Sequence, residues 1–277
     1  MVTDSTASLP PALAEGADVV TIPLQVTIDG ATFREGVDLG PARLVAALRS
    51  GARVTTSQPA PEAFARAYAR LAARGAREIV SVHLSGDLSG TVTSARTATQ
   101  MAGVPVHVVD SRTVAMGLGF GVLAGVRAAR SGASGSDVAR AAAGCSSGAT
   151  VLFALESLEH LRRGGRLGPL AAALGAVLGL RPVLGVVGGR LEVVEKVRTS
   201  ARARTRMAEA VAADLVRRRS PVVAVHHLGQ PELADELAEK ITELAGGRAG
   251  EIVVAEVSAV LGAHTGPGVL AAVVADG

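Results

Sequence analysis

The chain has 277 residues and a formal net charge of +3, from 28 Lys and Arg against 25 Asp and Glu. Only 2% of the residues are aromatic and the basic residues are spread along the chain, which argues against a nucleic-acid-binding protein. A single cysteine, Cys145, excludes an intrachain disulfide. We find neither a signal-peptide pattern nor an apolar run suited to a membrane span, so we expect a cytoplasmic protein.

In the first half of the chain, short apolar strands alternate with helical stretches. We expect strands over 78–84 and 106–110, and helices over 41–50, 61–74, 89–101 and 116–130. Ser89 is expected to cap the third of these helices. The segment 21–33 differs, because it alternates apolar and polar residues and contains Asp29-Gly30, a strong hairpin signal. Strand–helix alternation predicts a mainly parallel sheet covered on both faces.

Gly and Ser concentrate between the two halves, over 131–136 and 144–148. We place a domain boundary there, giving an N-terminal α/β domain of residues 1–149 and a C-terminal α/β domain with a mixed sheet of residues 150–277. Expected elements of the second half are strands over 151–155, 222–226 and 252–257, a hairpin over 182–197 and helices over 157–163, 201–219 and 231–245. The predicted fold class is two-domain α/β, with a cleft between the domains.

Three polar clusters interrupt the apolar background: Thr55–Pro59, Ser85–Thr91 and Gly262–Gly268. Ser89 and Gly90 open a predicted helix, whose first N–H groups are unpaired and attract anions. An ordinary N-cap or a hydroxyl-rich turn would give the same pattern. Together the clusters supply hydroxyls, a helix N-terminus and a histidine, which suit a carboxylate or phosphate held without a charged side chain or a metal.

His264 is the only large side chain in a predicted loop of small residues. It could donate a hydrogen bond to a carboxylate or titrate near neutral pH. His83 is expected inside a strand as a core residue with its polar atoms satisfied. His226 and His227 end a strand and could line a cleft, but no Cys or carboxylate spacing near them suggests zinc. We expect no metal and no cofactor.

Two further kinds of residue could serve a site. Asp4 and Asp110 each end a strand, where open parallel sheets bind ligands, although helix capping explains them equally well. The basic clusters Arg162–Arg166 and Lys196–Thr199 are either solvated surface or a docking patch for an acidic partner.

Seven motifs follow one another along the whole chain: V-T-D-S-T, T-S-Q-P, L-S-G-x-L-S-G-T, V-D-S, L-R-R-G-G-R, K-V-R-T and H-T-G-P-G. In this order they resemble the DegV family, the fatty-acid-binding subunits of bacterial fatty acid kinase. The resemblance implies two α/β domains that bury a long-chain fatty acid of the palmitate or oleate class. It implies no catalysis by the chain itself, but presentation of the fatty acid to an ATP-dependent kinase subunit that makes acyl-phosphate for phospholipid synthesis.

The resemblance also assigns residues. Thr56, Ser89, Gly90 and His264 correspond to the family's carboxylate-binding positions, and Arg166, with Arg198 or Arg202, to its contacts with the partner or the acyl-phosphate. The chain departs from the family at Val92 and at Thr113-Val114-Ala115, which leaves chain length and saturation open. We expect the apolar stretches 113–126 and 167–180 to line the tunnel. A transient contact with a membrane surface would suit such a carrier.

Two other functions fit the same residues. A serine hydrolase acting on acyl esters would use Ser89, His264 and Asp4 or Asp110 as a triad, although no G-x-S-x-G motif is present. A phosphate-metabolite binder would use the helix N-terminus at Ser89, but the low polarity of the chain disfavours it.

Overall fold

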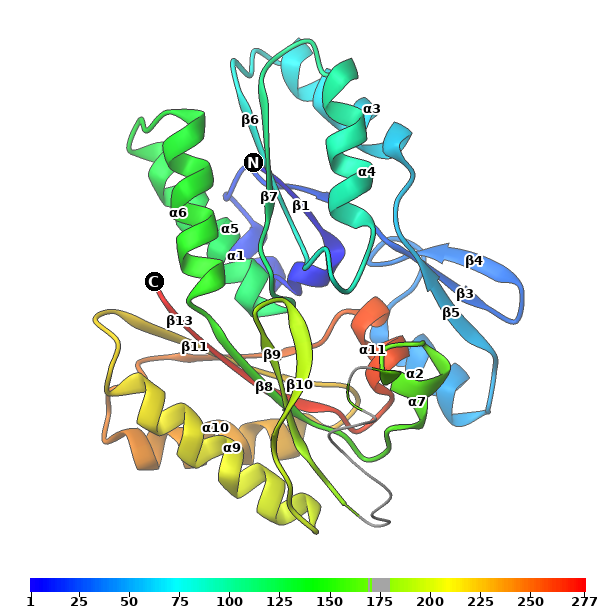
Figure 1. The fold of residues 1–277 in the computed structure, drawn as a ribbon, viewed down its shortest axis with the longest axis vertical. Coiled ribbons are helices and arrows are strands. Elements are labelled where there is room, and N and C mark those ends of the chain that lie inside the picture. Colours follow the sequence, from blue (N-terminus) through cyan, green and yellow to red (C-terminus); the bar gives the residue numbers. More distant parts are fainter. Residues whose placement is uncertain (169, 171–179) are drawn as a thin grey trace.

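The computed structural model describes residues 1–168, 170 and 180–277, whose strands form three sheets (Figure 1). The first sheet is parallel, with the strand order β2 (Val20–Ile22), β1 (Val2–Asp4), β6 (Ile79–His83) and β7 (Val106–Asp110). Its two faces are covered by α3 (Pro61–Ala73) with α4 (Thr91–Ala98), and by α5 (Met116–Arg130) with α6 (Gly135–Ser147). The predicted parallel sheet with helices on both faces is therefore confirmed.

A small antiparallel sheet projects from the side of the parallel one and forms a lobe with α2 (Pro41–Arg49) (Figure 1). Its strand order is β4 (Ala31–Arg34), β3 (Gln25–Ile28) and β5 (Val54–Ser57). Asp29 and Gly30 both have positive φ, 47° and 88°, as a two-residue type I′ turn requires. The hairpin signal is confirmed, and Thr55 to Ser57 lie in a strand.

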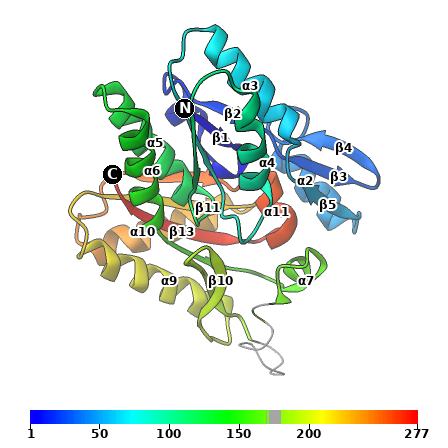
Figure 2. The ribbon, with the colours of Figure 1, turned by 45° about the horizontal axis from the view of Figure 1, so that its top comes forward.

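The third sheet is mixed, with the strand order β10 (Arg190–Glu195), β9 (Val183–Val187), β8 (Thr150–Ala154), β13 (Leu270–Asp276), β11 (Pro221–His227) and β12 (Ile252–Glu256). Only β11 and β12 run parallel. Alternate residues separate its faces: Leu152 joins the core under α9 (Ser200–Leu215) and α10 (Pro231–Ala245), whereas Val151 and Phe153 face α5 and the parallel sheet. Figure 2 shows α9 and α10 on one side of this sheet and α5 on the other.

The remaining helical segments among the described residues are short: α1 (Pro11–Ala14), α7 (Glu159–Arg163), α11 (Ala259–Thr265) and the 3-10 turns Ser5–Ala7 and Thr99–Met101. The mixed sheet together with the parallel one confirms the predicted α/β fold class. The boundary between residues 149 and 150 stays a prediction, although every strand of the mixed sheet lies beyond it.

Three local expectations are wrong. Residues 135–147 form α6 rather than a Gly/Ser-rich spacer, and His264 lies in the last turn of α11 rather than in a loop. Ser89 does not cap α4, because that helix begins at Thr91 with Gly90 at the N-cap position and no side-chain cap. The Ser89 hydroxyl oxygen lies 3.4 Å from the backbone nitrogen of Thr91, which is a long distance for a cap, and 2.9 Å from Thr91 Oγ1.

Candidate functional site

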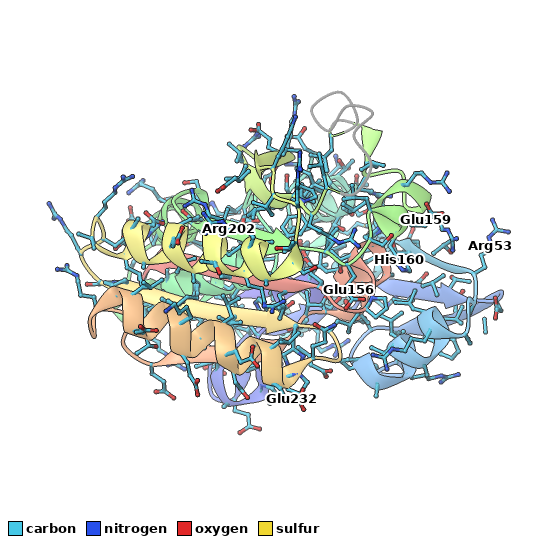
Figure 3. The ribbon with its side chains drawn as sticks, turned by 90° about the horizontal axis from the view of Figure 1, so that it is seen from below. Arg53, Glu156, Glu159, His160, Arg202 and Glu232 are labelled. Atoms are coloured by element: carbon cyan, nitrogen blue, oxygen red, sulfur yellow. The ribbon has the colours of Figure 1, made fainter. Side chains whose placement is uncertain are left out.

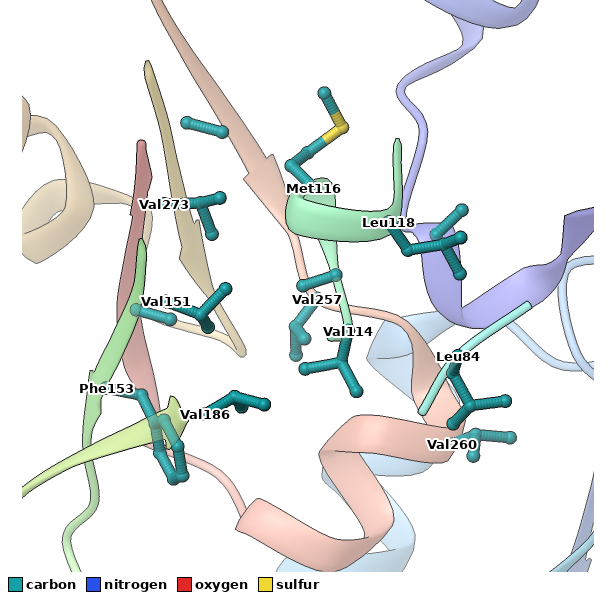
Figure 4. Close-up of a cluster of buried hydrophobic side chains, with 14 of the residues drawn as sticks. Leu84, Val114, Met116, Leu118, Val151, Phe153, Val186, Val257, Val260 and Val273 are labelled. Atoms are coloured by element: carbon teal, nitrogen blue, oxygen red, sulfur yellow. The ribbon is translucent and has the colours of Figure 1, made fainter. Parts of the chain in front are cut away.

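A cavity of about 340 Å³ lies between the inner face of the mixed sheet and the loops of the N-terminal half. Most of its wall is apolar: Leu24, Leu84, Leu88, Val114, Ala115, Val151, Phe153, Leu161, Val186, Leu191, Val257, Val260, Leu261, Val269 and Ala271. Figure 4 shows Val151, Phe153 and Val186 on one side and Leu84, Val114 and Val260 on the other. The cavity thus joins segments from both halves of the chain.

Polar groups gather in one part of this wall, and they come from four separate segments. Thr56 comes from β5, Ser89 and Gly90 from the loop before α4, His264 from the last turn of α11, and Arg166 from the segment after α7. The structure therefore brings together the four predicted carboxylate-binding positions and one of the predicted arginines on a single cavity.

His264 is held by one hydrogen bond, between its Nε2 and Thr56 Oγ1 at 2.8 Å. Its Nδ1 is buried and has no partner among the residues that the structure describes. Burial, helped by the positive charge of Arg166, lowers the pKa of His264 to about 4. The imidazole is therefore neutral at neutral pH, with Nε2 toward Thr56 and Nδ1 toward Gly164.

Gly90 lies in close contact with the side chain of Gln58. A Cβ at position 90 would lie 2.0 Å from Gln58 Oε1, so no other residue fits without moving that amide. The Gln58 side chain also reaches Ser94 Oγ, at 3.3 Å from its Nε2. Glycine here lets the Gln58 amide lie directly against the backbone before α4.

A second, more polar cleft of about 480 Å³ adjoins the first cavity. Arg53, His160 and Arg163 line it, and Thr56, Arg166 and His264 line both spaces. These three shared side chains consequently stand between an apolar cavity and a basic cleft. Burial first, and the charge of Arg163 second, lower the pKa of His160 as well.

The predicted arginines separate in the structure. Arg166 bonds the carbonyls of Gly164 and Leu88, at 2.5 and 3.1 Å, and so sits between the two cavities. Arg198 and Arg202 are exposed and line neither space. Figure 3 places Arg202 on α9, well away from His160 and Arg53.

The predicted tunnel walls are only partly found. From the stretch 113–126, Val114 and Ala115 line the cavity, whereas α5 packs its buried side chains into the protein core. Residues 169 and 171–179 of the stretch 167–180 lie outside the described residues. The mixed sheet supplies the opposite wall, which the sequence patterns did not indicate.

The hydrolase triad is not assembled. Asp4 Oδ2 lies 3.0 Å from Nδ1 of His83, and Asp110 accepts the N–H groups of Gly86 and Arg112. Ser89 bonds Thr91 rather than a histidine. Each expected member of the triad therefore has a different partner.

One residue that shapes the site was missed, because a contact with a side chain 100 residues away leaves no mark in the local sequence. Gly164 lies in the R-R-G-G-R motif, where only the arginines were singled out. A Cβ at Gly164 would lie 2.2 Å from Nδ1 of His264, so this position sets how closely α7 approaches the imidazole. Its φ of −74° is ordinary, so contact with His264, rather than backbone strain, is what favours glycine.

Over the described part of the chain, no three His, Cys, Asp or Glu side chains gather as a metal ion would require. The same residues contain no helix that is both long and apolar enough to cross a membrane.

Comparisons with known proteins agree over nearly the full length. Residues 1–276 match the family described as "Uncharacterised protein, DegV family". A DegV domain-containing protein of Streptomyces coelicolor is 42% identical over 276 residues, covering 100% of this chain and 98% of that protein. The structure described as fatty acid binding of a DegV family protein from Thermus thermophilus matches with a TM-score of 0.91 and 36% identity, over 99% and 98% of the two chains. DegV from Bacillus subtilis, described as a fatty acid binding protein, matches with a TM-score of 0.92 and 29% identity, over 100% and 98%.

Proposed function

This chain belongs to the DegV family, and we propose that it binds a long-chain fatty acid and presents its carboxylate to a partner kinase. The observation that carries the proposal is an apolar cavity that ends on hydroxyls and a neutral histidine. The Thermus and Bacillus relatives, both described as fatty acid binding, support the same ligand class.

The acyl chain accounts for the apolar wall. Each buried methylene contributes about 0.8 kcal/mol of transfer free energy, before the costs of association. The wall is made of Val, Leu and Ala with Phe153 as its one aromatic side chain, so it offers hydrocarbon contacts and few polar ones. A lipid tail fits this lining better than a sugar phosphate or a nucleotide does.

The carboxylate accounts for the polar end. Ser89 supplies a hydroxyl donor and the backbone at Gly90 supplies N–H groups. The bonded pair Thr56–His264 offers the ligand one donor in either tautomer: the Thr56 hydroxyl when Nε2–H donates to Thr56, or Nδ1–H when Thr56 donates to Nε2. These neutral donors can hold one anionic group, with Arg166 in the same wall. His264, neutral before binding, gains from the negative charge that the ligand brings.

The basic cleft fits the second half of the proposal. Because Thr56 and His264 border both spaces, a carboxylate between them would face Arg53, Arg163 and Arg166 on the outer side. A separate ATP-dependent kinase subunit would add the phosphoryl group there, and Arg166 would stabilise the acyl-phosphate. We assign Arg198 and Arg202, which are exposed and distant from the cavity, to docking of that subunit.

On this proposal the chain is a cytoplasmic carrier with no catalytic residue of its own. It needs no metal or cofactor, and the fatty acid is its ligand. Fatty acid would enter and leave through a transient contact with a membrane surface, and the acyl-phosphate would feed phospholipid synthesis.

Native mass spectrometry of the purified protein, followed by solvent extraction, tests the proposal. We expect one adduct of fatty-acid mass per chain, lost in the double variant Ser89→Ala/His264→Ala and retained in the surface control Ser147→Ala/His107→Ala. An apo mass that stays unchanged after addition of palmitate or oleate would refute fatty-acid binding. Covalent labelling of Ser89 by a fluorophosphonate would instead favour the hydrolase.

A further inference from the structure

Glu35 is a buried carboxyl group that the proposed function does not use. It follows β4, is only 5% exposed, and accepts the N–H of Val260 through Oε1 at 2.9 Å. Its Oε2 has no hydrogen-bond partner among the described residues. Burial raises the pKa of Glu35, and the hydroxyls of Ser5 and Ser258 lie beside it.

The hydrogen bond from Val260 fixes the beginning of α11. Three N–H groups at this end are accepted by side chains: Ser258 by Ser8 at 3.1 Å, Val260 by Glu35, and Leu261 by the Ser258 hydroxyl at 3.3 Å. Among these acceptors, Glu35 is the only one from the three-stranded lobe. The other end of α11 carries His264.

The same lobe also holds the far end of α11. Glu35 is tied to the lobe by its own N–H, which donates to the carbonyl of Leu24 at 3.0 Å. Thr56, from the strand β5 of that sheet, bonds His264 at 2.8 Å. The lobe therefore forms hydrogen bonds with both ends of α11, a seven-residue helix that lies more than 200 residues further along the chain.

From these contacts we propose that Glu35 is a positioning residue, which sets the tilt of α11 and thereby holds His264 against Thr56 for the ligand carboxylate. The expected effect on ligand binding rests on the proposed function, whereas the effect of Glu35 on the position of His264 follows from the contacts alone. Seven residues span roughly 10 Å, so a short rigid helix that shifts at one end also shifts at the other. An increase of less than about 1 Å in the donor–acceptor distance is enough to break a hydrogen bond. A small tilt of α11 is therefore sufficient to separate His264 from Thr56.

Glutamine and methionine substitutions separate hydrogen bonding from packing. Glu35→Gln keeps an oxygen that can accept the Val260 N–H, and its amide would point at the Ser5 and Ser258 hydroxyls. Glu35→Ala removes the acceptor, and Glu35→Met fills the same space without one, which covers the case in which the alanine variant does not fold.

The first measurement is the ring-nitrogen spectrum of His264 in the ligand-free protein, assigned with His264→Gln. We expect the His264 signals to move in Glu35→Met and Glu35→Ala but to stay at their wild-type positions in Glu35→Gln, while those of His226 stay unchanged in all three. Palmitate affinity should fall about tenfold in the methionine and alanine variants and less than about twofold in the glutamine variant.

Two controls separate positioning from general loss of stability. Asp38→Ala breaks an exposed ion pair in the same lobe, and Val211→Ala weakens the separate core under α9. Neither should move the His264 signals or the palmitate affinity. Unmoved His264 signals in a folded Glu35→Met protein would overturn the inference, as would a glutamine variant as impaired as the methionine one. If wild type binds no fatty acid, the proposed function fails, yet the ligand-free spectrum still decides the role of Glu35.

Discussion

Two histidines in this molecule each bond a hydroxyl, but their surroundings differ. His83 is fully buried in the parallel sheet, with Nε2 2.7 Å from Ser81 Oγ and Nδ1 3.0 Å from Asp4 Oδ2. Tyr68 donates to Ser81 in turn, at 2.8 Å. His264, at the cavity, has one ring nitrogen bonded to Thr56 and the other without a partner among the described residues.

The difference separates a structural network from a binding one. Every polar side chain around His83 bonds another group of the protein, as a buried network must if it is not to destabilise the fold. The site at His264 keeps hydrogen-bonding capacity that the protein itself does not use. The first cluster should therefore affect stability, and the second should affect ligand binding.

The largest effect should come from Asp4→Ala. Its carboxyl group accepts the N–H groups of Thr6 and Leu84 and pairs with His83, so its loss leaves several buried groups unsatisfied. We expect the free energy of unfolding, measured in urea, to fall by roughly 3–5 kcal/mol. Asp38→Ala, at an exposed ion pair, is the control and should change it by less than about 0.5 kcal/mol.

Thr56→Ala supplies the other half of this comparison. Thr56 is partly exposed, so the free energy of unfolding of the Thr56→Ala protein should change by less than about 1 kcal/mol. The affinity of this variant for fatty acid should nonetheless fall. If the Asp4→Ala protein is as stable as wild type, the hydrogen-bond network around His83 does not contribute to stability, and the contrast with His264 fails.

A smaller effect, confined to binding, is expected for Gly164→Ala. The new methyl group would contact the His264 imidazole, whose Nδ1 lies 2.2 Å from the Cβ position, and push it from Thr56. The helix-like backbone at Gly164 tolerates alanine, so the protein should fold normally. Titration with palmitate should give an affinity loss of about tenfold or more.

Gly144→Ala is the matched control for that substitution. A Cβ at Gly144, in α6, meets no atom within 4 Å. Palmitate affinity should equal that of wild type, and stability should rise slightly. Equal palmitate affinities of the Gly164→Ala and Gly144→Ala proteins would show that His264 does not contribute to fatty-acid binding.

Local signals in the sequence predicted much of the fold. The bounds expected for α10, 231–245, match the structure, because a proline marks its start and a glycine its end. The helix α6 was missed since its Gly and Ser residues suit loops. In the structure Ser134 caps α6 by accepting the Asp137 N–H, and α6 packs closely on α5, since a Cβ at Gly121 would lie 1.8 Å from Ser146 Oγ.

The site divides in the same way. Residue types and motif order identified Thr56, Ser89, Gly90 and His264, which the fold brings to one cavity. The contacts that position them could not be predicted, because they join residues 208 and 225 positions apart. Glu35 carries no local pattern, and its burial against α11 is decided only when the lobe and the end of the chain meet.

The smallest expected effect is a change in the pKa of His264, but not of His226, when fatty acid binds. Burial lowers the pKa of both His226 and His264 to about 4. Unfolded histidine binds protons below about pH 6.5, so the ligand-free protein loses stability as the pH falls from there towards 4. His226 is already bonded on both sides, by the Met116 N–H at Nε2 and the Ala255 carbonyl at Nδ1.

A carboxylate beside His264 favours its protonated form, so fatty acid should raise the pKa of His264 by about one unit and leave that of His226 unchanged. Histidine resonances followed by NMR from pH 7 to pH 4, with and without palmitate, would measure both values. Because a raised folded-state pKa reduces the proton uptake on unfolding, bound palmitate should also soften the loss of stability in acid. Equal shifts at both histidines would mean that the ligand changes the whole fold rather than adding one charge at its polar end.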